Sequence, residues 1–274
     1  MTLDCEVVRT RSGELAMRDR ISGEVMHPVV GPRVESRLLY VEPSRLQERL
    51  SEPISEPLVL LDVGLGAGSN AIAALEAAEA LPASARTLRI VSFDHSLAAL
   101  RHALEPEYAA AFGLTGDIAE AARAVLSDGI YRGERSEWRI ELGELPSTLQ
   151  RCDQASADIV FWDPFSPARN PSLWTIAAFR ELRALCRPGA TFFTYSAATS
   201  TRSALLLAGF AVAEGESTGL GKRTTQAALS HRDLARPLDR RWLQRLSRSS
   251  APLPPEAPPD AFARIAALPQ FSEA

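Results

Sequence analysis

Residues 58–70, "LVLLDVGLGAGSN", decide the fold. An apolar run of strand length leads directly into Gly64, Gly66 and Gly68, and the residues that follow, "SNAIAALEAAEAL", favour a helix. A strand that turns through glycines into a helix is the first unit of a parallel α/β sheet, and such a turn lets the backbone approach a ligand. We therefore expect a ligand site where this strand ends.

The spacing of the glycines separates two kinds of ligand. A dinucleotide site needs its third glycine three residues after the second, and Ser69 occupies that position. The tighter G-x-G-x-G spacing is typical of S-adenosylmethionine sites, which have no pyrophosphate to accommodate. Asp94, at the end of the next predicted strand, is placed to accept both ribose hydroxyls, and Glu144, just past a third strand, to accept the adenine amino group. Asp94 could also cap the following helix, which is compatible with either outcome.

Strands and helices alternate through the rest of the chain. Predicted strands occupy 58–62, 87–94, 138–142, 157–163, 190–196, 210–217 and 224–230, and predicted helices occupy 69–81, 96–104, 105–128, 144–150, 172–186 and 199–209. This alternation predicts a doubly wound, mostly parallel sheet, and the last two strands, joined without a helix, place one antiparallel strand near an edge. The fold class is therefore α/β, a Rossmann-like sheet of about seven strands.

Composition divides the chain into three parts. Residues 1–57 are expected to form a substrate-side extension with a hairpin and a broken helix, 58–230 the α/β domain, and 231–274 a tail. Six arginines between 231 and 250 could form a phosphate-binding stripe or simply a solvated helix face. The proline-rich residues 251–260 are expected to be mobile or to lie along the surface.

Several classes of function are disfavoured by residue counts. No apolar run approaches the ~20 residues that a membrane span needs, and the N-terminus has no apolar signal core, so we expect a cytoplasmic protein. Cys5, Cys152 and Cys186 are far apart, and the four histidines form no ligand cluster, so neither disulfides nor a metal cofactor is expected. A net charge of −4 argues against general coating of nucleic acid.

A second stretch, "FWDPFSPARNPSLW" (161–174), ends an apolar strand with a carboxylate in a proline-rich turn. Because ligands meet the carboxyl ends of parallel strands, Asp163 is expected to face the same crevice as the glycine loop. Asp163-Pro164-Phe165 resembles the Asp/Asn/Ser-Pro-Pro-Tyr/Phe turn of amino-group methyltransferases, which holds a nitrogen between a side-chain oxygen and a backbone carbonyl. Asp-Pro after a strand is also a common entry turn to a helix.

Methyl transfer to an amine explains these residue types. An ammonium has no lone pair, so a carboxylate that orients the nitrogen, relays its proton and stabilises the charge that develops on it favours the reaction. Asp163 is therefore the predicted catalytic residue, and Phe165 is predicted to stack on the ring that bears the amine. Trp174 and Phe179 are predicted to be core residues.

Three segments resemble the methyltransferase module of the MnmC family. They are "SGEVMHPVVGPRVES" (22–36), the region from "DPFSPARNPSLW" through "TFFTYS" (163–196), and "GLGKRTTQAAL" (219–229), and the match covers roughly residues 8–230. That family methylates the aminomethyl group on the wobble uridine of certain tRNAs, completing 5-methylaminomethyl-(2-thio)uridine. The resemblance implies an S-adenosylmethionine-dependent N-methyltransferase with tRNA as its partner.

The resemblance also assigns roles to individual residues. Asp163 matches the catalytic or amine-orienting position, and the cofactor positions are matched by Gly64, Gly66, Gly68 and Asp94, with Glu144 where Asp is usual. His27 is placed near cofactor or substrate by resemblance only. Lys222, the sole lysine among 30 basic residues, and Arg223 are candidates for binding a phosphate or the uridine carbonyl.

The chain departs from the family in ways that leave alternatives open. Bifunctional members carry a fused FAD-dependent oxidase, for which this chain is too short, so we expect the methyl step alone, without FAD; whether a separate oxidase acts upstream as a partner is left open by the sequence. Pro28 and Pro164 replace residues usual in relatives. A methyltransferase acting on a small-molecule or protein amine is the main alternative. A cofactor-binding protein without catalysis and a nicotinamide enzyme are more distant.

Overall fold

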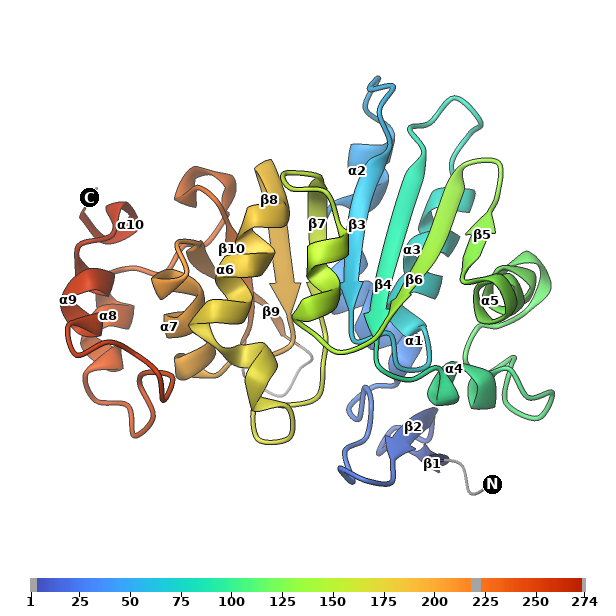
Figure 1. Ribbon diagram of the computed structural model, residues 1–274, viewed down its shortest axis with the longest axis horizontal. Helices are drawn as coiled ribbons and strands as arrows, with labels where there is room; N and C mark the ends of the chain where they lie inside the picture. Colours follow the sequence, from blue (N-terminus) through green and yellow to red (C-terminus); the bar gives the residue numbers. More distant parts are fainter. Residues whose placement is uncertain (1–3, 218–222, 273–274) are drawn as a thin grey trace.

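The centre of the molecule is one twisted sheet (Figure 1). The computed structural model describes residues 4–217 and 223–272. The strands of the sheet are β3 (Leu58–Val63), β4 (Leu88–Asp94), β5 (Ile130–Arg132), β6 (Ser136–Leu142), β7 (Ala157–Trp162), β8 (Cys186–Thr194), β9 (Ala211–Ser217) and β10 (Arg223–Ala228). Within the described residues these eight strands are ordered β5-β6-β4-β3-β7-β8-β10-β9.

Strand directions agree with the predicted α/β class. The five strands from β6 to β8 are parallel, and β10, one place from the edge, is antiparallel to both of its neighbours, as predicted. The predicted number of seven was one too few, because β5 adds an antiparallel strand at the other edge. With only three residues, β5 has too little sequence to show a period of its own, and its existence depends on pairing with β6.

The central strands are buried on both faces. All six residues of β3 and all six of β7 are buried, because helices cover each face of the sheet. Leu58 and Leu60 face one hydrophobic core, whereas Val59, Leu61 and Val63 face the other. The continuous apolar run of β3 therefore lies between two hydrophobic cores.

Two groups of helices form the outer layers. One core includes residues of the π-helical turn η1 (Arg37–Val41), α2 (Leu46–Leu50), α3 (Ser69–Glu79), α4 (Ala98–Ala103) and α5 (Gly116–Asp128), and α1 (Pro32–Ser36) lies against η1 and α3. The other includes residues of the short 3-10 helices η2 (Ser147–Arg151) and η3 (Pro171–Trp174), α6 (Ile176–Leu185), α7 (Thr199–Leu207), α8 (Arg240–Leu246), α9 (Ala261–Ala266) and α10 (Pro269–Ser272).

The N-terminal hairpin lies beneath the carboxyl ends of β3 and β4 (Figure 1). It consists of β1 (Cys5–Arg9) and β2 (Leu15–Asp19), paired antiparallel. The predicted hairpin is present, and two turns shape it and the segment after it: Gly13 N–H donates to Thr10 O at 3.1 Å and Gly23 N–H to Asp19 O at 2.9 Å. The hairpin therefore closes the edge of the sheet at which a ligand is expected.

The C-terminal residues pack on the second core. Trp242 and Phe271 are buried there and stack with ring centroids 6.1 Å apart at 8°. Ser203 of α7 donates to Pro252 O, and the backbone N–H of Ile176 at the start of α6 donates to Glu256. The proline-rich segment thus lies along the surface of the fold, against α6 and α7.

Two local expectations differ in detail. Residues 187–189, which separate the predicted helix 172–186 from the predicted strand 190–196, form a bulge inside β8, since residues on both sides of them pair with β7. The broken helix predicted over 31–50 is divided into α1, η1 and α2. Across the described ranges, no helix has the length and apolar character needed to cross a membrane.

Candidate active site

A cavity of about 1540 Å³ opens at the carboxyl ends of the parallel strands. A site for one small ligand usually measures about 300–1000 Å³, so this cavity has room for two ligands side by side. The predicted site residues in its wall are His27, Gly64, Gly66, Asp94, Glu144, Asp163, Phe165 and Arg223. Gly68 lies outside this wall, and Lys222 lies outside the described residues. Residues from distant parts of the sequence are therefore brought to one site.

Two loop glycines are required by protein contacts as well as by any ligand. A Cβ on Gly64 would lie 2.6 Å from the carbonyl oxygen of Asp163, and one on Gly66 would lie 2.8 Å from Met26 Sδ. Their φ angles of +90° and +53° are in the region that favours glycine. The loop after β3 is therefore packed directly against the Asp163 turn and the N-terminal segment.

Asp94 both caps a turn and holds the glycine loop. Its Oδ1 accepts from the backbone N–H groups of His95 at 2.7 Å and Ser96 at 3.1 Å. Its Oδ2 accepts from Gly66 N–H at 3.0 Å. The hydrogen bond to Asp94 raises the pKa of His95, against the effect of burial. Because Asp94 still lines the cavity, the capping role and the proposed ribose contact are compatible.

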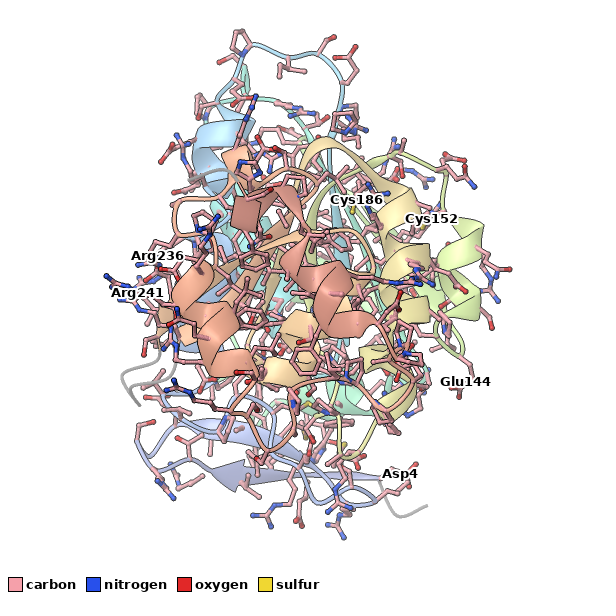
Figure 2. The ribbon with its side chains drawn as sticks, turned by 90° about the vertical axis from the view of Figure 1, so that its left-hand side faces the viewer. Asp4, Glu144, Cys152, Cys186, Arg236 and Arg241 are labelled. Atoms are coloured by element: carbon pink, nitrogen blue, oxygen red, sulfur yellow. The ribbon has the colours of Figure 1, made fainter. Side chains whose placement is uncertain are left out.

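Glu144 lies at the rim of the cavity. It follows β6, the strand next to β4, and its side chain is exposed. Figure 2 shows Glu144 and Asp4 of the N-terminal segment at the same edge of the molecule. The order β6-β4-β3 therefore brings Glu144, Asp94 and the glycine loop to one cavity wall, where the sequence predicts the cofactor site.

Asp62, two residues before the loop, is a buried acid that we did not predict. Its Oδ2 accepts from Ser92 Oγ at 2.7 Å, and Oδ1 is buried with no hydrogen-bond partner. Its pKa is raised from 3.8 to about 7, chiefly by burial and also by the charges of Asp163 and Asp94, against the hydrogen bond from Ser92, which lowers it. At neutral pH the folded protein therefore holds a carboxyl group that is partly protonated.

We expect Asp62→Asn to remove one pH-dependent component of stability. Because the folded pKa lies above the unfolded value of 3.8, the favourable contribution is fully present below pH 3.8 and is lost as pH rises to about 7. Over that range the folding equilibrium of the wild type should fall up to about tenfold per pH unit relative to the variant. Urea unfolding of both proteins between pH about 5 and about 8 measures the difference. Parallel curves would show that Asp62 titrates normally.

The Asp163 carboxylate is surrounded by hydrogen-bond donors. Asn70 Nδ2 donates to Oδ2 at 2.8 Å, the Tyr40 hydroxyl also bonds to the carboxylate, and His27 Nε2 lies 3.4 Å from Oδ2. Burial raises the pKa of Asp163, while His27, Tyr40 and Asn70 lower it. The side chain is 12 % exposed and lines the cavity, so an anionic oxygen is presented next to the glycine loop.

Side chains from other segments fix the backbone of the Asp163 turn. Tyr195 Oη donates to Pro164 O at 3.0 Å, and Trp174 Nε1 donates to Phe165 O at 2.9 Å. Glu24 accepts from Ser166 N–H at 2.9 Å and from its hydroxyl. Both carbonyls after Asp163 thus already accept a hydrogen bond, so the carboxylate is the strongest acceptor that this turn offers a substrate.

Trp174 and Phe179 are buried, as predicted for core residues. Phe165, by contrast, is partly buried and lies in the cavity wall. This difference keeps Phe165 as the aromatic side chain of the turn that is available to a ligand.

Arginines line the cavity at its other end. Arg202, buried at 7 % exposure, donates to Thr225 Oγ1 at 3.0 Å and to the carbonyls of Arg223 and Thr224. Arg223 Nε lies 3.7 Å from Glu214. Arg202 therefore fixes the start of β10 and places Arg223 at the cavity.

The arginine stripe of the C-terminal part lies on a different side of the molecule. Figure 2 shows Arg236 and Arg241 at the edge opposite to Glu144. Arg236 pairs with Glu216, and Arg240 donates to Phe271 O at 3.1 Å. Both the phosphate-binding and the solvated-face interpretations of this stripe therefore stand as proposals.

Several residues of the site were not predicted from the sequence. Glu24 lies in the same quoted segment as His27, and Tyr195 lies next to the last residue of a predicted strand. Both positions could therefore have been predicted as site residues from the sequence. Asn70 and Tyr40 carry no local signal, since their importance comes from reaching Asp163 across the fold. In the described part of the chain, no three His, Cys, Asp or Glu side chains are grouped so as to hold a metal ion.

Comparisons with known proteins agree with this geometry. A family model described as S-adenosyl-L-methionine-dependent methyltransferase matches residues 121–230. The tRNA 5-methylaminomethyl-2-thiouridine biosynthesis bifunctional protein MnmC of Methylibium petroleiphilum is 30 % identical over 230 residues, 80 % of this chain and 34 % of that protein. The protein of the same name from Aromatoleum aromaticum is 33 % identical over 201 residues, 69 % of this chain and 30 % of that protein. The chain thus spans about a third of the length of these relatives.

A solved structure supports the fold over nearly the whole chain. The crystal structure of MnmC2 from Aquifex aeolicus superposes with a TM-score of 0.74 at 24 % identity, covering 96 % of this chain and 86 % of that one. The glycine loop, the acids after β4 and β6, and the carboxylate turn after β7 therefore lie in a methyltransferase fold. The sequence matches and this site agree in type: the chain is similar to the methyltransferase family of the matched model and to about a third of the length of the MnmC proteins.

Proposed function

We propose that this protein methylates the 5-aminomethyl group of the wobble uridine of tRNA, giving 5-methylaminomethyl(-2-thio)uridine. The observation that carries the proposal is the Asp163 carboxylate, presented in a two-ligand cavity next to the glycine loop. The names of the relatives supply the tRNA substrate, although this chain matches only about a third of their length. A tRNA substrate would place the enzyme in the cytoplasm.

The proposed roles of the residues follow from their places in the cavity. Gly64, Gly66, Asp94 and Glu144 in the cavity wall would hold S-adenosylmethionine, which supplies an activated methyl group when bound, and Gly68, outside the wall, would complete the loop where α3 begins. Asp163 would accept a hydrogen bond from the amine, aim its lone pair, and stabilise the positive charge that the nitrogen carries after transfer. Because side chains already fix the turn, little ordering remains to oppose substrate binding.

The remaining residues would bind the nucleotide around the amine. Phe165 is proposed to stack on the uracil ring, and Arg223, with Lys222 beside it in sequence, to bind a phosphate or a uracil carbonyl. The arginines of 231–250 would then extend the contact to the tRNA backbone. An oxidase that removes a carboxymethyl group is the proposed upstream source of the aminomethyl substrate.

The experiment that tests this function compares three acceptors with the purified protein and labelled S-adenosylmethionine. The acceptors are tRNA bearing 5-aminomethyluridine, the same tRNA with an unmodified uridine, and a free polyamine. We expect label only in the first, recovered by nuclease digestion as 5-methylaminomethyluridine. The polyamine is included because Asp19 and Glu214 also line the cavity and could hold a small cation. Label in the polyamine and none in the tRNA would support the small-molecule alternative.

A further inference from the structure

His27 lies between two carboxylates at the wall of the cavity. Its Nε2 is 3.4 Å from Asp163 Oδ2, and its Nδ1 is 3.9 Å from Glu35 Oε2. The side chains of His27, Glu35 and Asp163 are only 12 %, 6 % and 12 % exposed. The three groups therefore interact in a poorly solvated place, where charges act strongly on one another.

The backbone holds both His27 and Glu35 in these positions. Glu35 Oε1 accepts from the N–H groups of Val29 at 2.7 Å and Val30 at 2.9 Å, which leaves Oε2 on the side of the imidazole. His27 has φ +53°, a left-handed conformation that non-glycine residues rarely adopt. A strained histidine held over an anchored carboxylate indicates that the ring position has a function.

Proton acceptance is the function that this chemistry fits. Burial raises the pKa of Asp163, and the hydrogen bonds from Asn70 and Tyr40, which favour its ionised form, oppose part of that effect; these bonds also engage Asp163 as an acceptor before any substrate arrives. Histidine is the side chain best suited to accept a proton near neutral pH, and an adjacent carboxylate stabilises the imidazolium that results.

We propose that His27 accepts the proton of the substrate ammonium at Nε2, and that Glu35 is a positioning residue that stabilises the protonated ring. This inference rests on the proposed function. One N–H bond of the ammonium breaks and its electron pair stays on the nitrogen, while a new N–H bond forms on His27. The positive charge passes from the ammonium to the imidazolium between two carboxylates. The neutral amine, held by Asp163, then has the lone pair that methyl transfer requires.

Other titratable groups on the surrounding elements lie around His27 and Asp163 and contribute to the pH dependence of this site. They are Glu35 of α1, Tyr40 of η1, Asp62 at the end of β3, Tyr195 after β8, and Glu24 of the N-terminal segment. Burial raises the pKa of Tyr40 and Tyr195 well above the usual range, so neither loses its proton near neutral pH. Glu35 and Asp163 are thus the charges in closest contact with the ring.

The test measures kcat/KM for aminomethyl-tRNA against pH in the wild type, His27→Gln and Glu35→Gln. The wild type is expected to gain activity with rising pH, because a proton acceptor works only in its unprotonated form. His27→Gln should be about 100-fold slower near neutral pH, with a deficit that shrinks at high pH because more substrate amine is already neutral. Glu35→Gln should shift the midpoint of the acidic limb to lower pH and lower the plateau, because the imidazolium loses a stabilising charge.

Matched controls separate proton transfer from a structural role. His102→Gln removes another histidine paired with a carboxylate, at 2.8 Å from Glu105 and not among the residues that line the cavity, and should keep the wild-type profile. Thermal unfolding and S-adenosylhomocysteine binding check that each variant is folded, and Glu35→Asp, which keeps the charge, should lie between wild type and Glu35→Gln.

Either of two results would overturn the inference, and they have different meanings. An active wild type, with variants whose profiles are parallel to it at every pH, would leave the proposed function standing and reject His27 as proton acceptor. A folded, cofactor-binding wild type with no activity on aminomethyl-tRNA at any pH would reject the proposed function, and the inference with it.

Discussion

Replacing Asp163 by asparagine is expected to lower methyl transfer to the aminomethyl group by about 1000-fold or more. Asparagine keeps the shape of the side chain and can still accept from Asn70, which lies 2.8 Å from Oδ2 in the wild type. It removes the negative charge that orients the ammonium and stabilises the product cation. The loss should therefore appear in kcat, because that charge is needed more as positive charge becomes fixed on the nitrogen.

Single-turnover transfer of labelled methyl, beside S-adenosylhomocysteine binding, measures this effect. Binding of the cofactor product should change little, since the glycine loop and Asp94 are untouched. Near-normal turnover in Asp163→Asn would reject the carboxylate as the amine site. Equal loss of cofactor binding would instead show that the substitution had disturbed the loop.

Gly64→Ala is expected to damage both stability and activity. The new Cβ would lie 2.6 Å from the Asp163 carbonyl oxygen and 2.8 Å from Pro164 N, and backbone atoms cannot move aside as a flexible side chain can. Together with the positive φ, the overlap should cost about 2–4 kcal/mol of unfolding free energy. Displacement of the Asp163 turn by about 1 Å should lower activity about 100-fold.

Gly13→Ala is the matched control for that substitution. Gly13 has φ +88°, close to the +90° of Gly64, but nothing lies within 4 Å of its added Cβ. It should cost about 1 kcal/mol and leave methyl transfer intact. Urea unfolding and the methyl-transfer assay on both variants separate backbone strain from the clash. Equal effects at the two positions would show that contact with the turn is not what requires Gly64.

The sequence predicted those features whose residue pattern lies within a single segment of the chain. The apolar run of β3 followed by glycines, and the carboxylate that ends β7, could be placed because strand ends of a parallel sheet share one edge. β5 could not be predicted, since three residues show no period without their partner strand. The nearness of Glu35, His27 and Asp163 was equally invisible, because it arises from the folding of α1 and the N-terminal segment over the sheet.

The glycine loop shows a limit of another kind. Its spacing indicated a cofactor correctly in type, but part of the reason for its glycines is contact within the protein. Asp163 lies against Gly64, and Met26 lies against Gly66. The glycine motif therefore marks positions where the backbone is closely packed, and only the fold shows which residues pack against it.

A crystal structure with S-adenosylhomocysteine and an anticodon stem-loop bearing 5-aminomethyluridine would test the central claim most directly. We predict the aminomethyl nitrogen within about 2.6–3.2 Å of an Asp163 carboxylate oxygen, on the side of the cofactor sulfur. Phe165 should lie on the uracil ring. A nitrogen bound instead to another acid of the cavity, such as Asp19 or Glu214, with Asp163 contacting only Asn70 and Tyr40, would contradict the claim.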